Sequence, residues 1–269
     1  MRKKILYGLF FLFIWSYVLY AAPIKIVATT SQLGSLVQEI GGNLVSPVVM
    51  IPAGSCPGHH ELRPGDIRAL LSGAGFIYHG WEGFAENVIE RAKIASLSIC
   101  KIDLSGSWLL PATQSRAAEM VYQFLSRIDN SHSAQYRNNY ETFLKKMASL
   151  EKTISFSSTR LRLRGLPVIV SDQQDDFLLA LGVDVVASFG REESLTLSDM
   201  NQMILVGRKK KVKMVVENLQ SASGVGKRIA EQLQVPYVVI SNFPGAWPGT
   251  SNIESTVKEN IRRLGVRKR

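Results

Sequence analysis

The sequence predicts an α/β protein of two lobes, each with a mostly parallel sheet flanked by helices, joined by one long rigid helix. Short apolar runs alternate with helical patterns in both halves of the 269-residue chain. Strands in such an order pair in parallel beneath the helices that connect them. A single amphipathic helical pattern separates the two halves. We therefore expect an N-terminal lobe over residues 22–130, a connecting helix over 131–163 and a C-terminal lobe over 164–269.

The first 21 residues have the order of a secretory signal. Residues 2–4 are basic, residues 5–19 form an apolar run, and the small residues Ala21 and Ala22 follow. An uncleaved anchor stays open as an alternative, because the run is nearly long enough to span a membrane. In either case we expect the rest of the chain in the periplasm or on the outer face of the cytoplasmic membrane.

The first lobe is predicted from apolar runs that alternate with helical patterns. The expected strands are residues 24–28, 45–51, 76–78 and 97–102. Ser31 suits the N-cap of the first helix, and Gly41 and Gly42 end it. Further helices are expected from Asp66 onward and over residues 84–92.

Two helical patterns occupy the middle of the chain. The first covers residues 112–128, and the second begins near Ser133. The apolar residues of the second recur in steps of four and three: Tyr136, Tyr140, Phe143, Met147, Leu150 and Ile154. A helix from there to about residue 160 would be roughly 40 Å long, since each residue adds about 1.5 Å. We expect this stripe to pack on a core and not to bind a cofactor.

The alternation of strands and helices resumes after residue 164. The expected strands are residues 168–170, 183–187, 212–216 and 237–240. The expected helices are residues 175–181, 224–234 and 253–264, with one more that Thr196 or Ser198 caps and that ends at Val206. This order predicts a second parallel sheet.

The sequence does not contain the common enzyme motifs. The nucleophile-elbow pattern G-x-S-x-G does not occur. Residues 221–228 match only half of a phosphate-binding loop, since Ser221 replaces its first glycine and Arg228 its hydroxyl residue. We therefore expect a binding protein and not an enzyme.

The chain is basic, with a formal net charge of +10. Much of this charge lies within residues 208–213 and 262–269, and no aromatic residues alternate with either cluster. Cations suit helix C-termini, so we interpret the clusters as a solvated helix end and a chain tail, and we expect no nucleic acid partner. Cys56 and Cys100 could pair in an oxidising compartment, and the sequence leaves that open.

Three of the four histidines follow predicted strands. His59 and His60 come after the second strand and His79 after the third, at the edge where a parallel sheet binds its ligands. Imidazole is a common metal ligand, so His59, His60 and His79 are candidate metal ligands. A hydrogen-bonding role within its loop stays an alternative for His79. Cys56 would add a thiolate beside His59 only as a free thiol.

Several short segments resemble one family of binding proteins. They are residues 26–30 (IVATT), 51–54 (IPAG), 64–70 (PGDIRAL) and 193–199 (ESLTLSD). Together they resemble the zinc- and manganese-binding cluster (cluster A-I) of ABC-transporter substrate-binding proteins, over nearly the whole chain after the signal. The resemblance implies two α/β lobes, a rigid connecting helix and a metal in the cleft between the lobes.

The chain departs from the ligand pattern of that family, which commonly supplies three histidines and one carboxylate. At three of the four positions it has Gly106 with Ser107, residues 171–174 (SDQQ) and residues 241–244 (SNFP). At the remaining position, where the family has a histidine directly after a proline, Pro57 is followed by Gly58, so that His59 and His60 are displaced by one and two residues.

Other side chains near those positions are polar but neutral. Gln174, Asn218 and Asn242 offer amide groups, which suit hydrogen bonding to a ligand or support of a metal site. Cys56 joins them as a candidate ligand-binding or supporting residue.

The resemblance implies an exported substrate-binding protein of an ABC importer. Its cargo would be a divalent metal ion, zinc or manganese, and its partner an ABC-transporter membrane permease. It would act as a monomer, without an organic cofactor. A receptor of the same fold for a metal chelate or a small organic solute stays an alternative, as does a surface adhesin on this scaffold.

Overall fold

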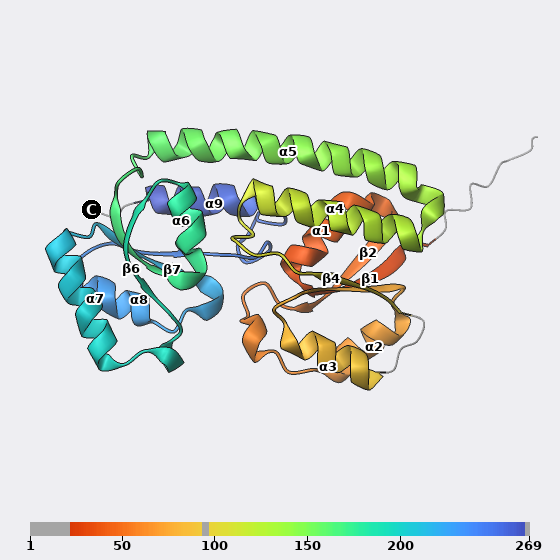
Figure 1. Cartoon of the computed structure of the whole chain (residues 1–269), viewed down its shortest axis with the longest axis horizontal. Helices are drawn as coiled ribbons and strands as arrows, with labels where there is room; N and C mark the ends of the chain where they lie inside the picture. Colours follow the sequence, from red (N-terminus) through yellow and green to blue (C-terminus); the bar gives the residue numbers. More distant parts are fainter. Residues whose placement is uncertain (1–21, 93–96, 267–269) are drawn as a thin grey trace, which may run out of the picture.

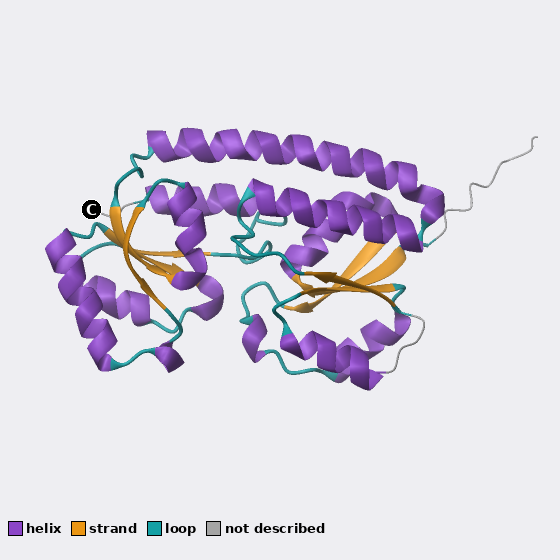
Figure 2. Ribbon diagram, viewed as in Figure 1, coloured by secondary structure: helices purple, strands orange, loops and turns teal. Residues whose placement is uncertain are grey.

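The computed structural model describes residues 22–92 and 97–266. It shows two parallel four-stranded sheets, each covered by helices, and one long helix that runs along both lobes (Figure 1 and Figure 2). The predicted fold class is therefore confirmed. The segment predicted as a secretory signal, residues 1–21, lies outside the described residues.

The N-terminal sheet has the strand order β2-β1-β3-β4, with all neighbours parallel. The strands are β1 (Ile24–Thr30), β2 (Val45–Ile51), β3 (Gly75–His79) and β4 (Ser98–Ile102). Helix α1 (Ser31–Gly41) covers one face, and α2 (Pro64–Ser72) and α3 (Gly83–Ala92) cover the other (Figure 1). All five residues of β3 are buried, as expected for a strand with helices on both sides.

Two helix starts in this lobe differ from the predicted ones. Thr30, not Ser31, is the N-cap of α1, and its hydroxyl accepts a hydrogen bond from the backbone N–H of Leu33. Helix α2 begins at Pro64, two residues before Asp66. A proline suits the first turn of a helix, because backbone N–H groups there have no hydrogen-bond partner within the helix. The Asp66 carboxylate then accepts a hydrogen bond from the backbone N–H of Arg63.

The long helix α5 (Ser133–Arg160) follows α4 (Pro111–Ile128) and packs along it. Its 28 residues correspond to about 42 Å. Five residues of the predicted apolar stripe are buried: Tyr136, Phe143, Met147, Leu150 and Ile154. They belong to one continuous cluster of buried apolar side chains that contains residues of both sheets. The helix therefore joins the two lobes through a shared core.

The C-terminal sheet has the strand order β6-β5-β7-β8, again with all neighbours parallel. The strands are β5 (Pro167–Ser171), β6 (Asp184–Phe189), β7 (Met214–Asn218) and β8 (Tyr237–Ile240). The helices are α6 (Asp175–Ala180), α7 (Leu197–Lys210), α8 (Val225–Leu233) and α9 (Ile253–Gly265). Thr196 caps α7, and α7 and α8 lie on the face of the sheet away from α5 (Figure 1).

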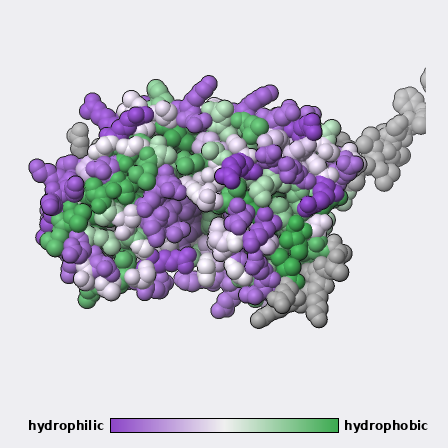
Figure 3. All heavy atoms as spheres, in the orientation of Figure 1, coloured by the Kyte–Doolittle hydropathy of each residue, from purple (hydrophilic) through white to green (hydrophobic). Residues whose placement is uncertain are grey.

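The face of the molecule in the view of Figure 3 is largely polar. Figure 3 shows hydrophilic side chains over much of the face in view, with apolar patches between them. No helix within residues 22–92 and 97–266 has the length and apolar character needed to cross a membrane.

Candidate binding site between the lobes

A cavity of about 390 Å³ lies between the two lobes. Its walls come from the loops and helix starts that follow all eight strands, which is where parallel α/β sheets bind ligands. The lining residues are Gln32, Cys56, Pro57, Trp81, Gly106, Ser107, Trp108, Gln173, Arg191, Asn218, Gln220, Ser221, Asn242 and Phe243. The two sheets therefore direct their carboxyl ends at one shared space.

Hydrogen bonds beside the cavity join the two lobes directly. The Gln32 amide donates to the backbone carbonyl of Asn242 at 3.2 Å. In the opposite direction, the Gln220 amide donates to the carbonyl of Ala53 at 2.7 Å. The Ser31 hydroxyl adds a third bond, to the carbonyl of Pro244 at 2.7 Å. These bonds hold the walls of the cavity at a defined separation.

The three predicted amide residues meet on the C-terminal side. Gln174 is fully buried, and its Nε2 donates to Oδ1 of Asn218 and to Oδ1 of Asn242, both at 3.0 Å. Asn218 and Asn242 line the cavity, whereas Gln174 lies behind them. The structure thus brings these side chains together, with Gln174 as the residue that orients the other two.

The imidazole of His79 is enclosed beneath two indoles. His79 is fully buried, and its Nε2 lies 2.9 Å from Oγ1 of Thr30. Its ring stacks on Trp81 at 4.9 Å between centroids and meets Trp108 edge-on at 4.4 Å. Burial lowers the pKa of His79 to about 3, so the imidazole is neutral near pH 7. His79 does not line the cavity but supports the two tryptophans that do.

A buried carboxyl group, that of Glu82, lies beside His79. Its Oε2 accepts hydrogen bonds from the Thr29 hydroxyl at 2.6 Å and from the backbone N–H of His79 at 2.8 Å. Burial raises the pKa of Glu82 to about 7 despite these bonds. Sequence reasoning missed Glu82, although its place three residues after the end of a buried strand was a usable signal.

His59 and His60 lie on the other side of the loop after β2. They and Cys56 line a second cavity, of about 520 Å³. The His60 Nε2 lies 3.2 Å from the carboxylate of Asp66, whereas His59 is exposed and makes no side-chain hydrogen bond with a described residue.

The described part of the chain does not gather a conventional metal site. Within residues 22–92 and 97–266, no group of three His, Cys, Asp or Glu side chains is placed to hold a metal ion. The structure therefore does not bring His59, His60 and His79 to one ion. Metal ligation by any of them stays a prediction.

The two cysteines are both free thiols and are not bonded to each other. Cys56 is half-buried and lines both cavities. Cys100 is buried in β4, and burial raises the pKa of its thiol to about 11.

Trp81, Trp108, Arg191 and Gln220 are among the residues of the inter-lobe cavity that were not predicted. Arg191 follows β6, and its guanidinium reaches Gly58 of the opposite lobe. A Cβ atom placed on that glycine would lie 2.8 Å from Nη1 of Arg191. Arg191 is the one charged side chain among the described residues that line the cavity. Only its place after a strand end could have indicated it from sequence.

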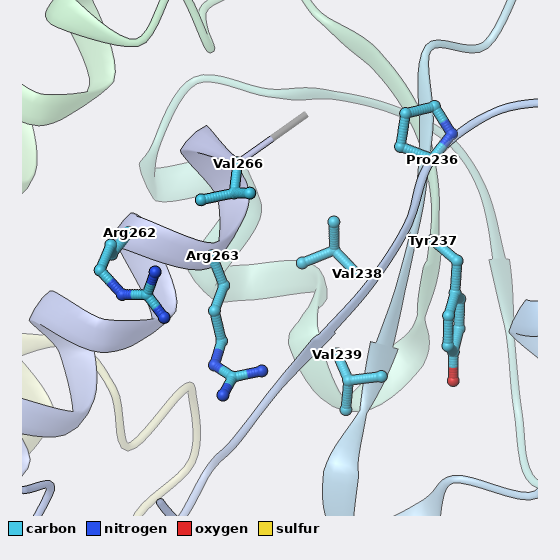
Figure 4. Close-up of a pocket in the computed structure, with 7 residues that line it drawn as sticks. All are labelled: Pro236, Tyr237, Val238, Val239, Arg262, Arg263 and Val266. Carbon is cyan, nitrogen blue, oxygen red and sulfur yellow. The ribbon is translucent and has the colours of Figure 1, made fainter. Parts of the chain in front are cut away.

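A further cavity of about 440 Å³ lies between β8 and α9 (Figure 4). Its arginines, Arg262 and Arg263, are both paired with Glu259, and Arg263 also lies 3.6 Å over the ring of Trp247. It borders the first residues of β8, at the end of the sheet opposite to the one that faces the inter-lobe cavity. We therefore take the inter-lobe cavity as the candidate site.

The model of one protein family, described as the periplasmic zinc-uptake complex component A, matches residues 26–265. A search of curated proteins finds no match.

Solved structures with the same fold include a crystal structure of ZnuA, with 18% sequence identity and a TM-score of 0.75, covering 90% of this chain and 99% of that one. The laminin-binding protein Lmb of Streptococcus agalactiae, described as bifunctional with adhesin and metal transporting activity, has 15% identity, a TM-score of 0.74 and coverages of 90% and 99%. A manganese-bound mutant of a periplasmic metal-binding protein from Candidatus Liberibacter asiaticus has 14% identity, a TM-score of 0.75 and coverages of 90% and 98%.

Proposed function

The chain belongs to the family of the periplasmic zinc-uptake complex component A, and from this membership we propose that it is the substrate-binding component of an ABC importer for a divalent metal. The family is one of transport components and not of enzymes. In this role the chain would capture its cargo outside the cytoplasmic membrane and deliver it to a membrane permease. The predicted secretory signal of residues 1–21 supports the external location.

The observation that carries this proposal is the cavity between the lobes. Every strand of both sheets ends at it, and hydrogen bonds from each lobe to the other enclose it. A cleft shared by two lobes suits capture and release, because a small opening of the lobes exposes the ligand without unfolding either one. Capture and release of a cargo in this cavity involve no covalent chemistry.

Zinc or manganese is the cargo that the comparisons support. One solved structure of similar fold is a zinc-bound ZnuA deletion mutant, and another is the manganese-bound protein named above. We propose the same two metals for this chain. An organic solute without a metal is the second candidate, and the absence of carboxylates and imidazoles among the described residues of the cavity wall favours it.

The three predicted histidines are proposed to have different roles. His79 supports the indoles of the cavity, and His60 is engaged with Asp66. His59 is the one whose imidazole is exposed and not hydrogen bonded to a described residue. We propose that any metal contact made by a histidine is made by His59, beside the free thiol of Cys56 in the second cavity and apart from the cargo in the inter-lobe cavity.

Metal content tests the proposed function. The chain from Ala22 onward, which contains every helix and strand that the structure describes, is loaded with zinc or manganese, separated from unbound metal and analysed by mass spectrometry. Loading is done both with the chloride salt and with the metal complexed to citrate. Retention of about one metal per chain in either form supports the proposal. The absence of retained metal in both forms would overturn it.

A further inference from the structure

We propose that the inter-lobe cavity takes its metal as a complex with a small carboxylate anion and not as a bare ion. This inference rests on the proposed function, since it specifies the form of the cargo. It follows from the charge, the hydrogen-bonding state and the size of the cavity.

The charge of the walls disfavours a bare cation. Among the described residues that line the cavity, none is a carboxylate or an imidazole, and Arg191 contributes a positive charge. Zinc in proteins takes thiolate, imidazole and carboxylate ligands, and an unpaired ion is costly to remove from water. The thiol of Cys56 is the one usual zinc-ligand group among the described residues of the wall. A bare divalent ion would therefore meet mainly neutral groups and one cation.

Most of the amide oxygens on the cavity walls, which could serve as ligands for a hard cation, already accept a hydrogen bond. Asn218 and Asn242 each accept a hydrogen bond from Gln174 through Oδ1. The Gln220 Oε1 accepts one from the backbone N–H of Asn242.

Backbone partners fix which end of each amide is the oxygen. Gln220 donates to the carbonyl of Ala53, and Asn242 donates to the carbonyl of Gln173. The Asn242 oxygen thus faces Gln174, which must present its NH₂ group to both asparagines. Three of the five amide oxygens on the walls thus already accept a hydrogen bond, which makes them poorer ligands for a metal.

The groups left free on the walls are mainly hydrogen-bond donors. The Arg191 guanidinium makes no hydrogen bond or ion pair with any described residue. The hydroxyls of Ser107 and Ser221 each accept a bond, which leaves their O–H groups free to donate. Such a set of donors matches carboxylate oxygens, and a guanidinium binds a carboxylate in a two-pronged geometry.

The size of the cavity also exceeds the needs of one ion. Its volume of about 390 Å³ lies in the range of small-molecule sites, roughly 300–1,000 Å³. The indole of Trp81, 53% exposed, and that of Trp108 supply an aromatic wall for the carbon skeleton of an organic anion. A metal with a di- or tricarboxylate around it fits these dimensions and this polarity.

Calorimetric titration of the chain from Ala22 tests the inference with three probes: zinc chloride, citrate, and zinc citrate. The same series is run with manganese. The variant Arg191→Gln removes the cationic donor. The matched control is Arg208→Gln, an exposed arginine at the far end of α7. We expect zinc citrate to bind with 1:1 stoichiometry, zinc chloride not to bind in the same concentration range, and Arg191→Gln alone to weaken binding of the complex at least ten-fold.

The other outcomes separate this inference from the proposed function. Binding of zinc chloride at 1:1 that neither citrate nor Arg191→Gln alters would overturn the inference and leave the metal receptor intact. Citrate alone binding as tightly as zinc citrate would overturn the metal cargo, and with it both proposals. Binding of none of the three probes would also overturn both.

Discussion

The imidazole of His79 stacks on the indole of Trp81, with the two ring centroids 4.9 Å apart. A histidine at the carboxyl end of a strand is thus a support for the wall of the binding site. Its Nε2 is already paired with Thr30, the cap of α1. The same imidazole meets the edge of Trp108, so one buried side chain positions both indoles.

The variant His79→Ala is expected to lose both stability and cargo affinity. Removing a buried ring leaves a cavity, and large-to-small changes in cores cost about 2–5 kcal/mol. The indoles would lose their common support, so affinity for the cargo should fall even where the variant stays folded. Urea unfolding and calorimetric titration measure the two effects. His132→Ala, at the turn between α4 and α5, is the control, and an equal loss of affinity there would contradict this role.

The variant Glu82→Gln is expected to alter how stability depends on pH. The pKa of Glu82 is raised from its ordinary 4.5 to about 7, so the folded protein holds a proton that the unfolded chain releases between these values. Stability from Glu82 is therefore present below pH 4.5 and is lost as the pH rises to about 7. At about 1.4 kcal/mol per pKa unit, the loss is about 3 kcal/mol.

Comparison of the two proteins by urea unfolding from pH 4.5 to 8 isolates this effect, because His79 titrates in both. Relative to the wild type, Glu82→Gln should gain stability as the pH rises. The exposed Glu151→Gln should keep a constant difference from the wild type. A constant difference for Glu82→Gln as well would contradict the raised pKa.

The variant Gln174→Leu tests the amide cluster behind the cavity. Both asparagine oxygens lose their donor, and leaving a buried polar group without a partner costs about 1–3 kcal/mol. We expect a lower midpoint of urea unfolding and weaker cargo binding. The neighbouring exposed Gln173→Leu is the matched control for stability, since among the described residues its side chain bonds only to Asp172. Equal unfolding midpoints for the two variants would show that the cluster does not brace this wall.

The variant His59→Ala tests whether the cargo metal depends on the second cavity and not on the inter-lobe cavity. His59 is exposed and its side chain bonds to no described residue, so the change should leave stability within about 0.5 kcal/mol of the wild type. Because His59 does not line the inter-lobe cavity, we expect the cargo metal to be retained as in the wild type, as measured by mass spectrometry after removal of unbound ion. His132→Ala is the control and should also retain the metal. Loss of the retained metal in His59→Ala alone would place the cargo at the second cavity and contradict the inter-lobe site.

Much of the fold was predictable because each element carries a local signal. The stripe from Tyr136 to Ile154 predicted α5, and the apolar runs predicted all eight strands, since buried parallel strands consist of continuous apolar residues. The start of α2 was placed two residues late, because the proline at its first position was not used as a start signal.

The candidate site was predictable only in part. Strand ends indicated the correct edge, and Gln174, Asn218 and Asn242 meet there. Strand ends do not show where a side chain points. The His79 side chain points inward because its Nε2 pairs with the Thr30 hydroxyl on the neighbouring strand, 49 residues earlier in the chain. Arg191 belongs to the site because the second lobe brings it close to Gly58 of the first. Local sequence patterns do not indicate such a contact between lobes.

The position of the bound metal shows directly whether the inter-lobe cavity holds the cargo. Crystals of the chain from Ala22 grown with zinc citrate would be measured on both sides of the zinc absorption edge. We predict one anomalous peak in the cavity between the indole of Trp108 and the amides of Asn218 and Asn242, with citrate density extending to Arg191. A peak confined to the loop of His59 and His60, with the inter-lobe cavity empty, would contradict this prediction.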